Sequence, residues 1–299
     1  MSTSGNITQY DLIGKKEDVS DIITNIAPTK TPFQTIIGSE TTHQVLHQWQ
    51  EDSLIDAAAN NAIEGANAAT AVSNPTSLRS NYTQILTKTA ATTGTADATK
   101  TYGRAKELSY QLALRSTELK RDLEFSMVGR SQAATAGSSG AARKMAAYIN
   151  QLDSTTYALN GGTPRALSET LVLTLAQTLF NAGADPDTLM IKPNDATIVS
   201  AFMAASGRTK YYTQDQKKVV NAVDYYESPY GVLRVVMNRF QLTSTALMFE
   251  PDMWKKLTLR NWFRQQLAKT GDSTQVQILG EFSLKHRNFL ASGAIGDLS

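Results

Sequence analysis

Cysteine is absent from all 299 positions of the chain. Without thiols the chain has no disulfide framework, no thiolate zinc site, no iron–sulfur cluster and no cysteine nucleophile. The absence is typical of proteins made in a reducing compartment. Any stable assembly of this chain must therefore rest on non-covalent contacts, or on a bond other than a disulfide.

Net charge and long apolar runs are also missing. The 29 basic and 27 acidic side chains leave a formal charge of +2, which argues against a mainly electrostatic nucleic-acid binder. No apolar run approaches the ~18–20 residues of a membrane span, and the N-terminus lacks the basic region and apolar core of a signal peptide. We therefore expect a product made in the cytosol, with no membrane partner.

Large apolar residues are scarce. Leu, Ile, Val and Phe make up 65 residues, or 22% of the chain, just above the range typical of disordered proteins. A lone globule of this length would usually hold more. The composition therefore predicts a thin or extended protein that completes its burial against copies of itself or against partners.

Motifs for catalysis and metal binding are few. There is no phosphate-binding glycine pattern and no Gly-x-Ser-x-Gly turn. His43 and His47 lie in a strand-like stretch, where side chains four residues apart sit ~13 Å from each other, so we interpret them as strand residues rather than metal ligands. His286 alternates in phase with Phe282 and Leu284, which favours a packing role. We expect no cofactor, no bound metal and no enzymatic activity.

Two weaker patterns have ordinary explanations. The adjacent carboxylates Glu51 and Asp52 would face opposite sides of a strand, so they cannot flank one bond as glycosidase carboxylates do. The basic and tyrosine-rich stretch 208–218 could contact a nucleic-acid strand, but an exposed loop or a subunit contact is the favoured interpretation.

The first third of the chain predicts an arm followed by a long hairpin. A short helix is expected at 18–26, and Thr31-Pro32-Phe33 is expected to form a turn or an extended piece. Alternating patterns at 41–50 and 82–90 then flank a polar loop rich in Ala and Asn. Such a hairpin has little core of its own and would project from the body, as an intersubunit arm does.

A long amphipathic helix is the clearest element of the sequence. It is predicted from about Gly103 to Gly129, because large apolar residues form one narrow stripe along it: Leu108, Leu112, Leu119, Leu123 and Met127. At ~1.5 Å per residue it would be a rod of about 40 Å. The stripe is expected to pack on the protein's own sheet rather than to form a coiled-coil seam. A shorter helix is expected at 141–152.

The last part of the chain predicts a compact α/β unit at 166–260 and a long strand after it. Helices are expected at 167–182 and from about 195 to 205, and strands at 188–191, 232–237, 246–249, 253–259 and 276–284. The last strand alternates strictly, which predicts that one of its faces is buried.

This order of parts resembles the Hong Kong 97-type major capsid protein of tailed bacteriophages, and more closely the podovirus major head proteins. The matching stretches are 31–38 (TPFQTIIG), 47–54 (HQWQEDSL), 107–113 (ELSYQLA), 118–124 (ELKRDLE), 267–272 (LAKTGD) and 281–288 (EFSLKHRN). They spread over most of the chain in the order found in that family.

The resemblance implies an α+β capsid fold of five parts. These would be an N-terminal arm (1–40), an extended loop (41–100), a peripheral domain with a long spine helix (101–165), an axial domain (166–262) and a return to the peripheral domain (263–299). The axial domain would gather around hexamer and pentamer centres, and the loop would reach over a neighbouring subunit.

The implied function is a structural protein that self-assembles into hexamers and pentamers of an icosahedral phage head. Its partners would be copies of itself, a scaffolding protein, a portal protein at one vertex and packaged double-stranded DNA bound without sequence preference. Assembly would occur in the bacterial host cytoplasm, and the product would be part of the virion. The alternatives are a head-decoration or tail component and, less favoured, an uncharacterised hydrolase.

Three groups of residues are candidates for intersubunit contacts. The alternative for each is that it only packs or solvates its own subunit. The candidates are Trp49 and Leu54 at the loop base, Lys120, Arg121 and Asp122 on the spine helix, and Lys269, Thr270 and Asp272 at the return turn.

Overall fold

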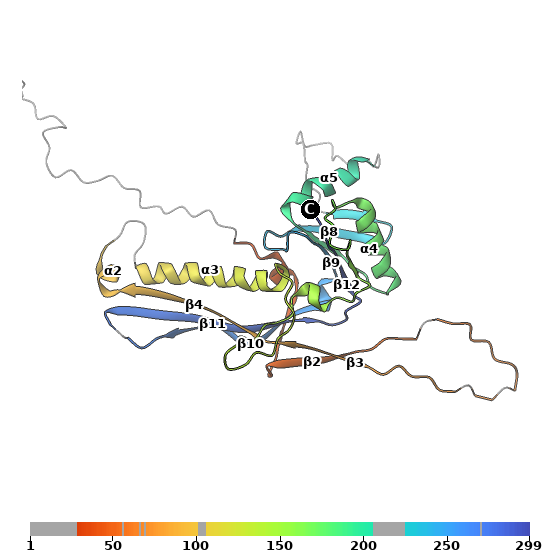
Figure 1. Cartoon of the computed structure of the whole chain (residues 1–299), viewed down its shortest axis with the longest axis horizontal. Coiled ribbons are helices and arrows are strands. Elements are labelled where there is room, and N and C mark those ends of the chain that lie inside the picture. The colour runs from red at the N-terminus through yellow and green to blue at the C-terminus, as the bar shows by residue number, and fades with distance from the viewer. Residues whose placement is uncertain are drawn as a thin grey trace, which may run out of the picture.

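The computed structural model describes residues 29–100 except 56, 66 and 69, and residues 106–205, 225–269 and 271–299. These residues form two main sheets and a separate two-stranded ribbon (Figure 1). The helix expected at 18–26 and the basic stretch 208–218 lie outside the described residues.

The first sheet is long and has four strands in the order β1-β10-β11-β4. Their bounds are β1 Gly38–Thr41, β4 Gln84–Thr93, β10 Trp254–Gln266 and β11 Ser273–His286. β11 pairs antiparallel with both β10 and β4, and it contains the strictly alternating stretch that predicted a long strand. The expected strand at 253–259 is the first half of β10, so its predicted place in the α/β unit is wrong.

Helix α3 (Glu107–Val128) lies along this sheet (Figure 1). Leu119, Leu123 and Met127 of the apolar stripe are buried. Their burial against the protein's own sheet confirms the predicted packing. Lys88 on β4 forms a partly exposed salt bridge with Glu118 on α3 at 2.9 Å, and this salt bridge also joins the helix to the sheet.

The second sheet has six strands in the order β5-β12-β9-β6-β8-β7 and carries helices α4 and α5. The bounds are β5 Tyr157–Ala158, β6 Thr188–Ile191, β7 Tyr225–Ser228, β8 Gly231–Met237, β9 Ala246–Phe249, β12 Ser292–Ile295, α4 Glu169–Asn181 and α5 Ala196–Ala205. The two helices and the strands β6, β8 and β9 agree with the sequence prediction. The predicted segment boundary at 262/263 falls inside β10, and β12 joins this second sheet.

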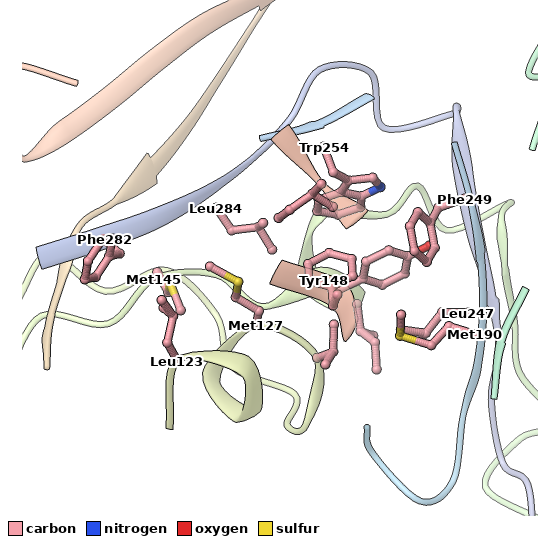
Figure 2. Packing of buried hydrophobic residues seen from close by; sticks show 14 of the residues in the cluster. Leu123, Met127, Met145, Tyr148, Met190, Leu247, Phe249, Trp254, Phe282 and Leu284 are labelled. Carbon is pink, nitrogen blue, oxygen red and sulfur yellow. The ribbon is translucent and has the colours of Figure 1, made fainter. Parts of the chain in front are cut away.

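One of the two buried clusters lies where the two sheets meet (Figure 2), and the other lies between the second sheet and its helices α4 and α5. Tyr148 stacks on Trp254 with ring centroids 4.4 Å apart, and Phe33 and Phe249 meet the Tyr148 ring edge-on. The Tyr148 hydroxyl contacts the carbonyls of Met248 and Gly293, both at 3.0 Å. This aromatic group ties the start of the described chain to both sheets.

The helix expected at 141–152 is wrong. Only Tyr148–Gln151 forms a single 3₁₀ turn, η2. The backbone N–H of Ala146 donates to Asn81 Oδ1 at 2.8 Å, and that of Met145 donates to Gln84 Oε1 at 3.3 Å. Amide side chains from other parts of the chain therefore bind the donors that a helix would have used.

The segment at Thr31-Pro32-Phe33 also differs from the prediction, because it opens a short helix, α1 (Pro32–Ile36). Proline fits the first turn of a helix, where its missing N–H is not needed. The buried Glu124 of α3 accepts the next two N–H groups, from Phe33 at 2.8 Å and Gln34 at 3.0 Å. A distant carboxylate thus caps this helix.

The ribbon consists of β2 (Leu46–Glu51) and β3 (Ser77–Tyr82), paired antiparallel from Leu46↔Tyr82 to Glu51↔Ser77. It leads into the loop 52–76, which projects from the body (Figure 1). The hairpin prediction was correct in kind but placed the second strand too late. The strand predicted at 82–90 is β4, which pairs with β11 instead.

Candidate intersubunit contact surfaces

The projecting loop 52–76 exposes large apolar side chains. Leu54 is 96% exposed, Ile63 is 83% exposed and Val72 is 74% exposed. Burying one such side chain is worth about 1.5–3 kcal/mol, so this surface gains stability when another surface covers it. The loop also carries Asp52 and Glu64, and the sequence has no Lys or Arg between Lys30 and Arg79. The loop surface is therefore apolar and acidic.

Trp49, the second candidate at the loop base, lies on β2 and is only 8% exposed. Its ring stacks on that of His47 with centroids 5.9 Å apart. Burial and the nearby Lys285 charge lower the pKa of His47. Trp49 is thus packed within its own subunit, in contrast to Leu54.

The three candidates on α3 are placed differently from one another. Lys120 is exposed, whereas the Arg121 guanidinium lies over the Phe240 ring at 5.5 Å. Asp122 pairs with Lys88 on β4 at 3.0 Å. Of these three residues, only Lys120 has a charged group with no ion pair and no aromatic ring beside it within the described part of its own subunit.

A groove of about 330 Å³ lies beside Lys120. Its apolar lining comes from Leu119 on α3, Trp262 and Phe263 on β10 and Ile278 on β11, and Arg264 adds a second cation. β1 covers β10 only from Lys255 to Thr258. Within the described residues, the rest of that β10 edge has no strand beside it, so backbone groups are open next to the groove.

The return turn between β10 and β11 lies at the end of the long sheet, beside α2 (Gly94–Ala98), far from the projecting loop (Figure 1). Lys269 and Asp272 are exposed there, and the Asp272 carbonyl accepts a hydrogen bond from the Gly94 N–H at 3.1 Å. Thr270 lies outside the described residues. The three candidate groups thus occupy separate surfaces of the subunit, and the fold does not gather them into one site.

Sequence reasoning missed the buried carboxylates that hold the elements together. Glu124 accepts from α1 and from Asn238 Nδ2 at 2.8 Å, and burial raises its pKa. Glu281 on β11 pairs with Arg143 at 2.6 Å and Arg260 at 2.9 Å. Nothing local in the sequence marks these residues, because their partners are distant along the chain. Phe33 lies 91 residues from Glu124, and Arg143 lies 138 residues from Glu281.

A second missed group lies at the outer end of the ribbon. Glu51 pairs with Arg79 at 2.6 Å and accepts the Phe289 N–H at 2.7 Å. The sequence offers one indication of this group: Arg79 is the first Lys or Arg after Lys30.

The described residues contain no group of three or more His, Asp or Glu side chains that could hold a metal ion. Within the same residues, no helix has the length and apolar character needed to cross a membrane.

The long sheet with its helix, the second sheet and the projecting ribbon define the class of the fold. Solved capsid shells share it across the whole chain. The capsid of a native GTA particle matches with a TM-score of 0.70 at 10% identity, with 100% of both chains covered. The capsid of cyanophage A-1(L) matches with a TM-score of 0.67 at 10% identity, with 97% of this chain and 98% of that chain covered. At such low identity these likenesses show the fold alone, and the predicted Hong Kong 97-type capsid fold is confirmed.

The sequence then identifies the family. The chain belongs to the SU10 major capsid protein family, which matches residues 4–299. It is also similar to the major capsid protein of Escherichia phage Phieco32, at 29% identity over 334 aligned positions that cover 96% of this chain and 95% of the relative.

The family fixes the broad role of the chain. It is a structural, shell-forming major capsid protein of the tailed-phage type, and it is not an enzyme. It is a component of the virion. The alternatives of a decoration or tail component and of a hydrolase are set aside.

Proposed function

We propose that the chain assembles into hexamers and pentamers of an icosahedral head, with the loop of each subunit lying on its neighbour. The observation that carries this proposal is the exposed apolar surface of the loop 52–76, with Leu54 at 96% exposure. A projecting segment whose described residues are all exposed is stabilised when a second copy covers it.

The groove beside Lys120 is the surface of the neighbour that suits this loop. Its apolar lining matches the leucine, isoleucine and valine of the loop, and its cations Lys120 and Arg264 match the loop carboxylates. Such a contact joins two different patches of the same chain, and repeated around an axis it closes a ring. Lys120 and Leu54 are therefore the candidates to which we assign intersubunit contact.

The five segments take the roles that the family resemblance implies. Residues 1–40 act as the arm, 41–100 as the extended loop, 101–165 and 263–299 as the peripheral domain, and 166–262 as the axial domain. A scaffolding protein takes part in assembly in the host cytoplasm, a portal protein occupies one vertex, and the shell encloses double-stranded DNA without reading its sequence. The near-zero net charge supports the last point, because a weakly charged shell does not hold DNA strongly.

Native mass measurement of the purified full-length chain tests the oligomeric state, with and without a co-expressed scaffolding protein. We expect hexamers, pentamers or closed shells. A strictly monomeric product under all assembly conditions would contradict the proposal.

A further inference from the structure

The ribbon β2–β3 is fixed to the body near its inner end, where Ser283 Oγ also donates to the Tyr82 carbonyl at 2.8 Å, and again at its outer end. The inner point is Asn81, whose amide group donates to the Leu284 carbonyl at 2.6 Å and accepts from the Ala146 N–H. The outer point is Glu51, whose carboxylate accepts the Phe289 N–H at 2.7 Å. Asn81 lies opposite His47, four residues from Glu51, so the two points are about 13 Å apart along the ribbon.

The outer point is held by further contacts of Glu51 and Phe289. Arg79 bonds the second Glu51 oxygen at 2.6 Å, and its guanidinium lies 4.2 Å above the Phe289 ring. The Phe289 carbonyl in turn accepts the Asp153 N–H at 3.2 Å. The ribbon therefore contacts Phe289, a residue whose position is fixed by a hydrogen bond to Asp153 of the body.

The contact continues into the core as a column of stacked rings. Phe289 stacks on His286 at 5.6 Å, and His286 stacks on Trp254 at 4.0 Å with an interplanar angle of 6°. Trp254 is the ring that packs on Tyr148 at the junction of the two sheets. A displacement of the outer end of the ribbon would therefore disturb rings in the middle of the molecule.

We propose that Glu51, Arg79 and Phe289 form a strut that sets the angle at which the ribbon leaves the body. A ribbon held at one point can swing, whereas one held at two points moves with the body. The strut makes the ribbon rigid as far as Glu51 and leaves conformational freedom to the loop beyond it. Glu51 and Arg79 are then positioning residues that aim the loop at its neighbour. This last step rests on the proposed function.

The test uses the absence of cysteine. Cysteines introduced at the exposed positions Ser77 and Thr174 carry spin labels, one at the outer end of the ribbon and one on α4. Pulsed electron–electron double resonance on the unassembled full-length subunit then gives the distribution of distances between the two labels. We expect Glu51→Ala to broaden this distribution at least twofold. Glu51→Gln should broaden it less, because the amide oxygen still accepts the Phe289 N–H.

Two further variants keep the test decisive. Glu118→Gln removes a carboxylate of similar ion pairing that does not touch the ribbon, and it should leave the distribution unchanged. Arg79→Met replaces Glu51→Ala if the latter fails to fold. An unchanged width in a folded Glu51→Ala or Arg79→Met subunit would overturn the strut.

A second measurement separates the strut from the proposed function. Particle diameters from wild-type and Glu51→Ala chains are compared by electron microscopy, together with the melting temperatures of the subunits. We expect a wider spread of diameters for the variant at a temperature where its subunits remain folded. Identical diameters despite a broadened label distribution would overturn the aiming role, and a wild type that forms no particles would instead contradict the proposed function.

Discussion

His286 is a buried histidine that its surroundings keep neutral. Its ring nitrogens contact the Gln151 carbonyl at 2.8 Å and Ser292 Oγ at 3.0 Å, and its ring stacks on Trp254. Burial in this site lowers its pKa from 6.5 to about 3. The sequence predicted a packing histidine from its phase with Phe282, and the structure agrees.

This burial predicts a loss of stability in acid. The unfolded chain binds a proton at His286 below about pH 6.5 and the folded chain does not until about pH 3, so falling pH favours unfolding across that window. The slope is at most about 1.4 kcal/mol per pH unit. Chemical denaturation of unassembled wild type and His286→Gln between pH 7 and pH 4 should show a flatter decline for the variant. Parallel declines would contradict the assignment.

We expect Leu54 to contribute to assembly and not to the folding of its own subunit. Because the side chain is 96% exposed, Leu54→Asp should leave the subunit melting temperature unchanged while lowering the assembled fraction about tenfold, the effect of ~1.4 kcal/mol at a contact. Ser53→Asp, at the neighbouring exposed position, is the matched control. Sedimentation of assembly mixtures measures both, and equal loss in the two variants would contradict a specific role for Leu54.

At the scale of elements, Gly280 on β11 makes room for Trp262 on β10. A Cβ at Gly280 would lie 2.6 Å from Trp262 Cε3 and 2.5 Å from Phe282 Cε2. The Trp262 ring in turn lines the groove beside Lys120. The glycine therefore lets two neighbouring strands present an apolar wall to that groove.

Gly280→Ala should destabilise the subunit by about 1–3 kcal/mol, because the ring of Trp262 must move in a packed layer. Gly271→Ala, where an added Cβ has open space, is the control. Urea unfolding followed by Trp fluorescence measures the difference between the two variants. A stability loss no greater than that of the control would show that the layer tolerates the methyl group.

The proposed contact between the loop of one subunit and the groove of the next can be tested by joining the two chemically. In a Leu54→Cys, Phe263→Cys chain each subunit carries both halves of the contact, so oxidation of assembled material should link successive subunits. Because the chain has no other cysteine, a ladder of linked species on a non-reducing gel reports this contact alone. Thr174→Cys in place of Phe263→Cys should give no ladder, and a ladder absent from both would place the loop elsewhere.

Elements with their own periodicity were predictable, and their partners were not. The stripe of α3 and the alternation of β11 follow from local spacing, and both elements formed as expected. The 253–259 strand was assigned to the wrong sheet, because the pairing of Leu257 with Ser283 is a long-range choice. The predicted helix at 141–152 failed for the same reason, since Asn81 and Gln84 take its backbone donors.

The candidate contacts show the same division. The sequence correctly indicated a projecting loop from a stretch that is rich in Ala and Asn and contains no Lys or Arg, and Leu54 lies on it. It could not distinguish Leu54 from Trp49, because exposure depends on how the ribbon packs: one side chain is open and the other is 8% exposed. The groove needed Leu119, Trp262 and Ile278 together, and these residues come from three elements.

At the scale of the whole molecule, the low share of large apolar residues reflects where burial takes place. The two sheets and the helices α3, α4 and α5 hold the buried clusters of the subunit, whereas the large apolar residues Leu54, Ile63 and Val72 of the loop 52–76 are exposed. On the proposed function, a neighbouring subunit buries this exposed apolar surface during assembly. Without cysteine, the shell forms without any disulfide.

Deletion of residues 55–76 tests this account most directly, with negative-stain imaging of the purified chain as the measurement. The wild type should form closed shells, and the variant should form none. The helical circular-dichroism signal of the variant should match that of the wild type, because α3, α4 and α5 lie outside the deleted loop. Normal shells from the deletion variant would contradict the account.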